Sequence, residues 1–380
     1  MKLIHLSDLH IGKRVNEFSM LEDQKYILTK ILNIIDEEKP DAVLIAGDVY
    51  DKTTPSVEAV ELLDDFLVRL AKRMLNVFII SGNHDSAERL AFAGRLIDSS
   101  GIHLSPVYSG IIEPFSFEDE FGTVNIYMLP FVKPINVRRF FPEEETGTYT
   151  DAIATAIRHI GINRENRNIL VAHQFVTGAE RSDSEEEAVG GLDNVDASVF
   201  EDFDYVALGH IHGEQNMSSC KIRYCGTPLK YSFSEASHIK SVSVVELGAK
   251  GSLNIKKVPL VPQRDMVEIR GTYEELTAKS FYDGTTYDKD YMHITLTDEE
   301  DVPDAMAKLR MIFYHNLMKL DYDNKRTRQQ AIISGAEDIE KKTPLELFDE
   351  LYEKQNGVNM SAQQCEFVAG LIKEIQEERA

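Results

Sequence analysis

Residues 41–51 read DAVLIAGDVYD, and this stretch decides the fold. The run from Ala42 to Ala46 is apolar at every position, which is typical of a strand buried on both faces of a parallel sheet. Gly47 lets the backbone turn, and two carboxylates follow at Asp48 and Asp51. Because open α/β sheets bind ligands outside the carboxyl ends of their strands, the stretch predicts a buried strand and one edge of a site.

Four other apolar segments end in the same way. They cover residues 3–7, 77–81, 169–172 and 205–208. The polar residues that follow them are Asp8 and His10, then Asn83, His84 and Asp85, then His173, and finally His210 and His212. Asp8 and His10 stand two residues apart, as do His210 and His212. In an extended chain the two side chains of each pair point to the same side. If these strands end at a common edge, their polar groups can converge on one point.

The composition is that of an ordinary globular protein. The chain has 380 residues, enough for two or three domains, with 43% apolar and 28% charged residues. A formal charge of −23 argues against an autonomous nucleic-acid binder. Binding to DNA would therefore need local basic patches, metal ions or a partner that supplies positive charge.

Targeting signals are not expected. No apolar run approaches the roughly 18 residues that a membrane span needs, and the N-terminus enters the first strand without a signal peptide. The three cysteines, Cys220, Cys225 and Cys365, are too few and too irregularly spaced for a disulfide framework. We therefore expect reduced thiols and a cytoplasmic protein without membrane contact.

The first half of the chain alternates strands with helices, and the second half is richer in strands. Helices are expected from Leu21 to a point before Pro40, from near Pro55 to Leu70, and over 87–99 and 150–160. Later strands are expected over 124–129, 221–225, 242–247 and 253–258. Two sheets packed face to face with helices outside would accommodate both halves. The acidic, glycine-containing residues 178–195 are interpreted as a solvated loop.

Two smaller units follow a boundary near 260–265, which Pro259 and Pro262 mark. Residues 266–320 predict a small α+β unit, with a strand over 291–296 and a helix over 302–320. Beyond it, Thr343 and Ser361 open two short amphipathic helices. Their apolar stripes must be buried on their own domain or on another chain.

The donor groups at the strand ends predict a metal centre. Imidazole, carboxylate and amide oxygen without thiolate suit Mn²⁺, Fe²⁺ or Zn²⁺. The set exceeds the needs of one ion that keeps an open position, whereas two ions sharing a carboxylate would use all of it. Two ions about 3.5–4 Å apart can clamp a phosphoryl group and activate water. A single histidine is usually structural, but five of the eleven histidines fall at strand ends.

These motifs resemble those of the calcineurin-like metallophosphoesterases. The matching stretches are Asp8-x-His10, Gly47-Asp48-x-x-Asp51, Gly82-Asn83-His84-Asp85, His173 and Gly209-His210-x-His212. Within that superfamily, residues 6–12, 190–193, 205–212 and 226–232 look like the SbcD-type nuclease subunits. The likeness covers about 1–260, is topological over 265–320 and is weak in the terminal helices.

The resemblance implies a role for each site residue. Asp8, His10 and His212 would hold one divalent ion, Asn83, His173 and His210 a second, and Asp48 would bridge them. Mn²⁺ is expected first, with Mg²⁺, Fe²⁺ and Zn²⁺ as alternatives. His84 would stabilise or protonate the departing 3′-oxygen. Asp85 would either orient His84 or cap its loop. Relatives often have His where this chain has Asp51, so we assign Asp51 no contact with substrate. We expect it instead to support a metal ligand without binding the ion itself.

The resemblance also implies an activity and partners. The expected function is a Mn²⁺-dependent DNA nuclease, a 3′–5′ double-strand exonuclease and single-strand or hairpin endonuclease. It would work with an SbcC-type coiled-coil ATPase in end processing, repair and recombination. A homodimer built on parts of 56–70 and 87–99 would sit within a heterotetramer. Lys13, Arg14 and Arg89 are candidate basic contacts to DNA, or ordinary surface charges.

The implied domains are a nuclease domain over 1–262, a DNA-capping domain over 263–322 and a helical partner-binding region over 323–380. Two other readings compete. A small-molecule or cyclic-nucleotide phosphodiesterase could use the same centre, but it would not need residues 265–380. A scaffold with a vestigial centre is disfavoured because no ligand position is lost.

Overall fold

The computed structural model describes residues 1–92, 94–185, 193–300, 302–325, 327, 343–356 and 359–378. Its first sheet has six strands in the order β16-β15-β1-β4-β5-β6. These strands are β1 (Lys2–Leu6), β4 (Ala42–Ala46), β5 (Asn76–Ile80), β6 (Ile102–Leu104), β15 (Ser241–Leu247) and β16 (Leu253–Pro259). Strands β1, β4, β5 and β6 run parallel, and β15 and β16 extend the sheet in antiparallel fashion.

The second sheet also has six strands, in the order β13-β14-β12-β9-β8-β7. They are β7 (Phe115–Asp119), β8 (Gly122–Leu129), β9 (Arg167–His173), β12 (Tyr205–Gly209), β13 (Gln215–Met217) and β14 (Ser219–Tyr224). The inner four, β14, β12, β9 and β8, are parallel, and the two edge strands pair antiparallel with them.

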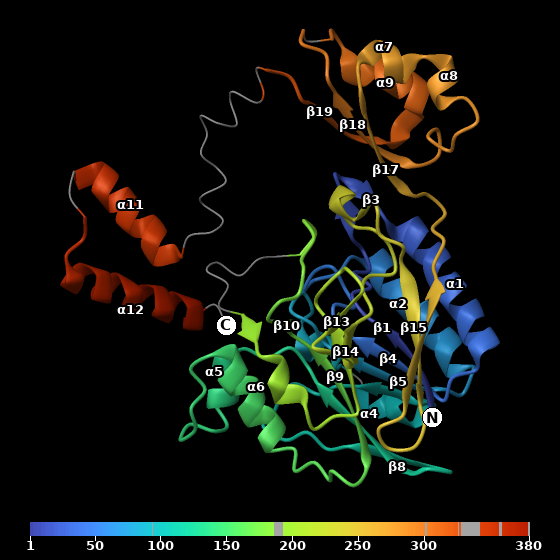
Figure 1. Ribbon diagram of the computed structural model, residues 1–380. Coiled ribbons are helices and arrows are strands. Elements are labelled where there is room, and N and C mark those ends of the chain that lie inside the picture. Colours follow the sequence, from blue (N-terminus) through green and yellow to red (C-terminus); the bar gives the residue numbers. More distant parts are fainter. Residues whose placement is uncertain are drawn as a thin grey trace.

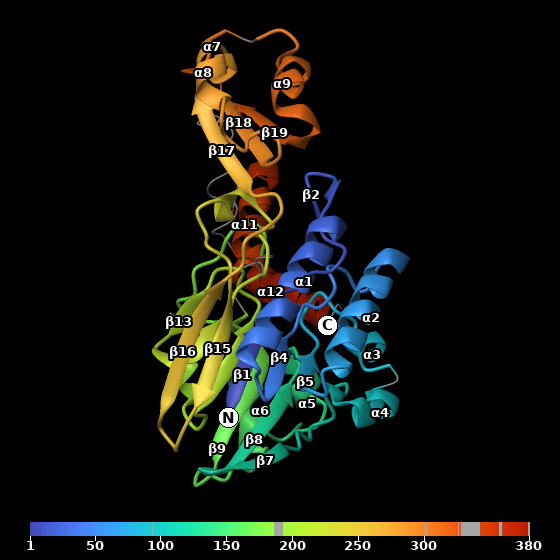
Figure 2. The same cartoon turned by 90° about the vertical axis from the view of Figure 1, so that its right-hand side faces the viewer.

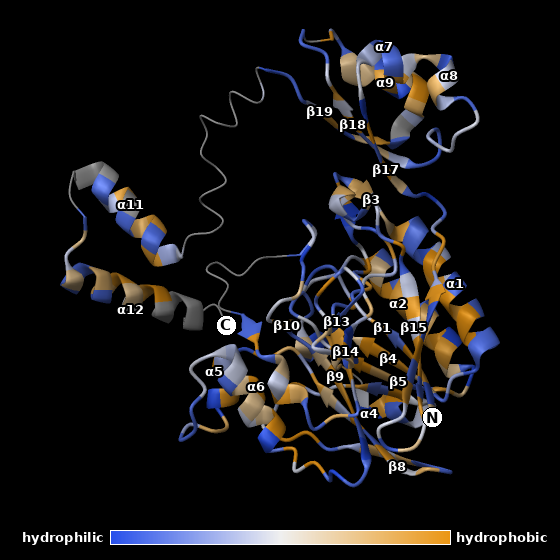
Figure 3. Ribbon diagram, viewed as in Figure 1, coloured by the Kyte–Doolittle hydropathy of each residue, from blue (hydrophilic) through white to orange (hydrophobic). Residues whose placement is uncertain are grey.

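The two sheets pack face to face, which confirms the predicted sandwich. Leu44, Phe78, Val171 and Ala207 belong to the single apolar cluster between them. Helices α1 (Leu21–Glu38) and α2 (Val57–Ala71) cover the outer face of the first sheet. Helices α5 (Pro134–Arg138) and α6 (Tyr149–Arg158) cover that of the second (Figure 1). Because both faces of the central strands are buried, these strands are mostly apolar, and Figure 3 shows much of them in orange.

A buried arginine connects the two sheets at the end of the sandwich remote from the carboxyl ends of the parallel strands. Arg167, the first residue of β9, is 1% exposed. Its guanidinium binds the Asp119 carboxylate and the carbonyl oxygens of Gly122 and Gly248. The Asp119 carboxylate also accepts a 2.9 Å hydrogen bond from the N-terminal amino group. These contacts join the start of β9 to the turn that follows β15.

The predicted helix over 87–99 is wrong as one element. The structure has α3 (Ala87–Leu90), α4 (Gly94–Ile97) and a 3₁₀ turn at Asp98–Ser100. Only Leu90 of the expected apolar face is buried, whereas Phe92 and Leu96 are 81% and 80% exposed. A short helix is marginal without tertiary burial of its apolar face, so the segment breaks.

Residues 266–322 form a separate three-stranded parallel sheet with its own core. Its elements are β17 (Met266–Gly271), α7 (Tyr273–Thr277), α8 (Lys279–Tyr282), β18 (Tyr291–Leu296), α9 (Ala305–Phe313) and β19 (Leu317–Tyr322). The predicted helix over 302–320 is therefore wrong at its end. Leu309, Phe313 and Leu317 have helical spacing, but Leu317 pairs with Met292 of β18 instead. Figures 1 and 2 show this unit at one end of the sandwich.

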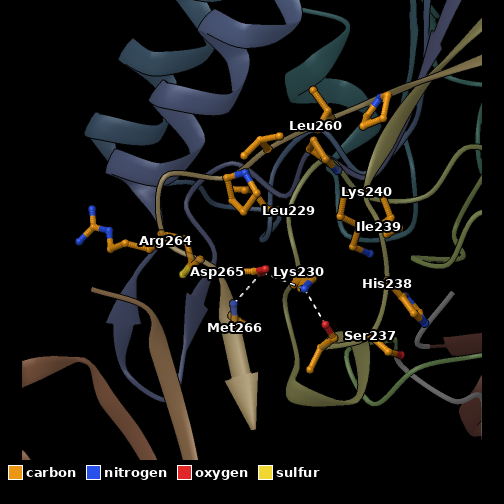
Figure 4. Close-up of a pocket in the computed structure, with 16 residues that line it drawn as sticks. Leu229, Lys230, Ser237, His238, Ile239, Lys240, Leu260, Arg264, Asp265 and Met266 are labelled. Atoms are coloured by element: carbon orange, nitrogen blue, oxygen red, sulfur yellow. Dashed lines mark hydrogen bonds and ion pairs between the residues drawn. The ribbon is translucent and has the colours of Figure 1, made fainter. Parts of the chain in front are cut away.

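The junction between this unit and the sandwich encloses a cavity of about 380 Å³ (Figure 4). Its basic side chains are paired internally. Lys230 Nζ lies 2.8 Å from Asp265 Oδ1, and Arg264 Nε donates to Asp23 Oδ1 at 3.1 Å. On the other side of Asp23, the Tyr291 hydroxyl donates to Oδ2 at 2.7 Å. The Lys230 and Arg264 side chains that line the cavity thus each have a carboxylate partner, and these pairs join the two units.

The two terminal helices are α11 (Pro344–Asn356) and α12 (Ala362–Glu378), which confirms the two predicted starts. They contact each other and lie apart from the sandwich in Figure 1. Phe348, Leu351 and Phe367 stay 45–68% exposed on them. The remaining short strands are β2 (Arg14–Val15), β3 (Phe18–Ser19), β10 (Phe175–Val176) and β11 (Asn194–Val195).

Candidate metal centre

The structure brings all seven expected metal ligands together. Asp8, His10, Asp48 and Asn83 follow strands β1, β4 and β5 of the first sheet. His173, His210 and His212 come from β9 and from the loop after β12 of the second sheet. The centre therefore lies where the carboxyl ends of parallel strands from both sheets meet.

The side chains form two adjoining groups. Asp8, His10 and His212 each place a ligand atom within 4.8 Å of the other two, and so do Asp8, Asp48 and His173. In the first group, His10 Nε2 lies 3.1 Å from His212 Nε2. In the second, Asn83 Oδ1 lies 2.9 Å from His173 Nε2 and 2.9 Å from His210 Nδ1.

Asp48 belongs to the second group and also lies close to the first. Its Oδ2 is 3.3 Å from His173 Nε2, 3.7 Å from His10 Nε2 and 4.0 Å from His84 Nε2. Its other oxygen, Oδ1, accepts a 2.9 Å hydrogen bond from the His84 amide. Gly82 is required beside it, because a Cβ there would stand 2.1 Å from Asp48 Oδ1. Asp48, like Asp8, thus has ligand atoms of both groups within reach.

The residues present fit a pair of divalent cations. Asp8 Oδ2 and His210 Nε2 are buried without a hydrogen-bond partner among the described residues, which is costly unless an ion compensates them. Asp8, His10, Asp48 and His210 all have positive φ angles, between 43° and 103°. Such backbone strain costs about 1–3 kcal/mol per residue and concentrates at functional sites.

The pKa values follow from burial and close charges. Burial raises the pKa of Asp8 to about 6. Burial also acts to raise the pKa of Asp48, but the neighbouring His173 and His10 imidazoles outweigh it and keep that pKa well below the ordinary value. Burial acts to lower the pKa of His173, but the neighbouring Asp48 carboxylate outweighs it and raises that pKa to about 9. Burial lowers the pKa values of His10 and His210, which favours their neutral, ligating forms.

His84 lies beside the centre, and its ring is held by Asp51. Its Nδ1 is 3.2 Å from the Asp51 carbonyl oxygen, which can only accept, so Nδ1 carries the proton and Nε2 faces Asp48. The Asp51 carboxylate contacts Lys13 at 2.9 Å and lies 3.7 Å from His10 Nδ1. These contacts place Asp51 behind a candidate ligand, where the sequence suggested a supporting role.

Asp85 behaves as a loop cap. Its carboxylate accepts backbone hydrogen bonds from Val49 at 3.0 Å, Tyr50 at 2.9 Å and Gly82 at 2.9 Å. It thereby fastens the loop after β4 to the loop after β5. Of the two roles that the sequence left open for Asp85, these contacts favour the capping one, because the His84 ring is oriented by the Asp51 carbonyl oxygen instead.

Sequence reasoning missed several supporting residues. Gln24 Nε2 donates to the His10 carbonyl oxygen at 2.7 Å, and the Tyr231 hydroxyl donates to the Leu9 carbonyl oxygen at 2.6 Å. Glu185 belongs to the segment 178–195 that we interpreted as solvated, yet it is buried and accepts from the His212 amide. Residues 186–192, including most of the 190–193 motif, lie outside the described residues. Tyr231 lies within the 226–232 motif, which was the available signal.

The three candidate DNA contacts each have an internal partner. Lys13 pairs with Asp51, Arg14 donates to the Glu17 carbonyl oxygen, and Arg89 donates to Thr53 and Thr54. They would have to exchange these partners to bind a phosphate.

Comparison with known families decides the identity of the fold. Residues 1–214, more than half of the chain, match the family described as calcineurin-like phosphoesterase. The chain belongs to the calcineurin-like phosphoesterases. Residues 262–356 of this phosphoesterase also match the family described as type 5 capsule protein repressor C-terminal domain, SbcD_C. The fold implies two divalent metal ions, and the enzyme is a metal-dependent phosphoesterase.

A similar full-length protein is known. The phosphoesterase is 34% identical over 324 residues to the SbcD subunit of nuclease SbcCD from Staphylococcus epidermidis, covering 84% of this chain and 85% of that protein. The expected SbcD-type resemblance is thereby confirmed.

Two solved structures are more distant. A dimetal phosphatase from Danio rerio has 13% identity and a TM-score of 0.39, over 69% of this chain and 96% of that one. Protein TT1561 of Thermus thermophilus has 11% identity and a TM-score of 0.38, over 67% and 98%. The assignment does not depend on them. Separately, none of the described helices is both long and apolar enough for a membrane crossing.

Proposed function

We propose that this phosphoesterase is a Mn²⁺-dependent DNA nuclease, with 3′–5′ exonuclease activity on double strands and endonuclease activity on single strands and hairpins. It acts with an SbcC-type ATPase in DNA end processing, repair and recombination. The observation that carries the proposal is the placement of Asp48 within 3.7 Å of ligand atoms from both groups. The 34% identity to a nuclease subunit favours DNA as the substrate.

In this proposal the ligands divide as the family resemblance implies. Asp8, His10 and His212 would hold one ion, Asn83, His173 and His210 would hold the other, and Asp48 would serve as a ligand of both. When bound, two such ions supply Lewis acidity and lower the pKa of water enough to make it a nucleophile at neutral pH. Mn²⁺ suits this mixture of nitrogen and oxygen ligand atoms, and Fe²⁺, Zn²⁺ and Mg²⁺ are the alternatives.

His84 is the proposed catalytic side chain. With Nδ1–H donated to Asp51, the His84 Nε2 atom is free to hold a proton for the departing 3′-oxygen. Its side chain is 15% exposed, so it can meet a substrate phosphate at the rim of the centre. Asp85 acts by fastening the loop that carries His84.

The other parts of the chain take the remaining roles. We propose a nuclease domain over 1–262, a DNA-capping domain over 263–322 and a partner-binding region over 323–380. Exposed Val57 on α2, Phe92 between α3 and α4, and Leu96 on α4, at 70%, 81% and 80%, favour a dimer contact over parts of 56–70 and 87–99. The exposed stripes of α11 and α12 suit a helical partner such as a coiled-coil ATPase.

The test is a cleavage assay with end-labelled linear duplex and hairpin DNA, with Mn²⁺ and with or without the ATPase. The unchanged protein should shorten the 3′ ends, and His84→Ala should lose about 10²–10⁴-fold in rate while keeping its bound Mn²⁺. Lys52→Ala, an exposed change in the same loop region, is the matched control and should cut normally. Hydrolysis of cyclic nucleotides without any action on DNA would contradict the proposal and favour a small-molecule phosphodiesterase.

A further inference from the structure

His212 is held on three sides by residues far from it in sequence. Its Nδ1 lies 2.5 Å from Ser184 Oγ, and its amide donates to a carboxylate oxygen of Glu185. Its carbonyl oxygen accepts from Lys240 Nζ at 2.9 Å. Ser184 and Glu185 come from the loop after β10, and Lys240 directly precedes β15.

Glu235 joins these contacts into one network. It is fully buried, and its Oε1 accepts from Ser184 Oγ at 2.6 Å while its Oε2 pairs with Lys240. The direct distance from Glu235 Oε1 to His212 Nδ1 is 3.9 Å, too long for a hydrogen bond. The carboxylate therefore reaches the imidazole through the Ser184 hydroxyl.

The direction of each hydrogen bond in this chain is fixed by chemistry. Lys240 can only donate, so Glu235 meets it as a carboxylate acceptor. The Ser184 hydroxyl has one proton, which it donates in a hydrogen bond to Glu235 Oε1. Ser184 Oγ can then only accept from His212, so the proton of the neutral His212 ring is on Nδ1. The lone pair of Nε2 consequently faces His10 and Asp8 in the first ligand group.

We propose that Ser184 and Glu235 are positioning residues of the metal centre, which hold His212 in the Nδ1–H tautomer through a Glu235–Ser184–His212 relay. Lys240 keeps Glu235 ionised and also fixes the His212 backbone. The inference deepens the proposed function, because it rests on His212 being a ligand of the first ion. Such supporting partners raise the basicity of a ligating imidazole and fix the orientation of its ring.

The relay also explains why the loop after β10 lies against the centre. Glu185 is 9% exposed although it belongs to an acidic segment, because the His212 amide and the Ser182 hydroxyl and amide bind its carboxylate. Release of that loop would remove Ser184 from His212. The first ion and residues 182–185 should therefore stabilise each other.

The test measures Mn²⁺ binding to the full chain by titration calorimetry, with Ser184→Ala and Glu235→Gln as the variants. One of the two Mn²⁺ sites should weaken about 10–100-fold, and the other, at His173 and Asn83, should keep its affinity. Ser232→Ala is the matched control, because Ser232 Oγ donates to the same Glu235 Oε1 at 3.1 Å without contacting His212. Ser184→Thr retains the hydroxyl and should restore the affinity.

A second measurement needs no metal. The ring ¹⁵N shifts of His212 in metal-free, histidine-labelled protein should show the Nδ1–H form, and Ser184→Ala should populate the Nε2–H form. Unchanged Mn²⁺ affinity in both variants, equal loss in Ser232→Ala, or an Nε2–H ring in the unchanged protein would each overturn the inference. None of these readouts uses DNA, so failure of the nuclease assay alone would leave the relay standing.

Discussion

Arg167→Met should destabilise the sandwich strongly without touching the metal centre. The change removes a guanidinium that is 1% exposed and binds Asp119 and the carbonyl oxygens of Gly122 and Gly248. Breaking a buried ion pair by removing one partner costs about 3–5 kcal/mol, and the loss should lie at the lower end of that range because Asp119 is 26% exposed and keeps its N-terminal partner. We expect that loss in the free energy of unfolding, measured by urea denaturation of the full chain followed by circular dichroism.

Arg164→Met is the matched control. Arg164 forms a 2.7 Å pair with Asp202, but its side chain is 75% exposed, so the cost should stay below about 1 kcal/mol. Equal losses in the two variants would refute the reasoning, because burial would then not decide the strength of the Arg167 contacts.

The ion pair between Arg167 and Asp119 also predicts that stability depends on pH. The Arg167 guanidinium and the N-terminal amino group hold the pKa of Asp119 well below its ordinary value. A carboxyl whose pKa is lowered by folding stabilises the fold fully above its unfolded pKa of about 4. That contribution is lost as the pH falls from there towards the folded-state value. In Arg167→Met the stability lost between pH 5 and pH 3 should be smaller, which denaturation at both values would measure.

Two further changes probe the centre and the proposed dimer. Gly82→Ala places a Cβ 2.1 Å from Asp48 Oδ1, so it should displace the carboxylate, cost about 1–3 kcal/mol in stability and abolish binding of at least one Mn²⁺ in titration calorimetry. Two Mn²⁺ bound with unchanged affinity would contradict it. Leu96→Glu changes a side chain that is 80% exposed, so stability should stay within about 0.5 kcal/mol while light scattering shows a monomer. A persistent dimer would exclude α4 from the contact.

The strands that carry the candidate ligands were predictable because both of their faces are buried. Both faces of β4 and of the 169–172 part of β9 pack against apolar groups, so these residues are all apolar and polar side chains follow closely after them. The type of each side chain at these ends, at Asp48 and His173 for example, then indicated a metal centre before any contact was known.

Features that depend on distant contacts could not be predicted locally. The helical spacing of Leu309, Phe313 and Leu317 predicted a helix to Leu320, but residues 317–322 pair with β18. Residues 87–99 break because their apolar face is not covered. Ser184 and Glu185 looked solvated because their partners, His212 and Glu235, come 27 to 51 residues later. The capping role of Asp85 likewise depends on amides of Val49 and Tyr50.

The central claim is that one carboxylate joins two metal ions, and crystals of the full chain grown with Mn²⁺ test it most directly. Anomalous scattering should show two peaks about 3.5–4 Å apart, with Asp48 bound to both. One peak should contact His10 and His212, and the other His173 and Asn83. A single peak, no peak, or two ions of which Asp48 binds neither would contradict the account.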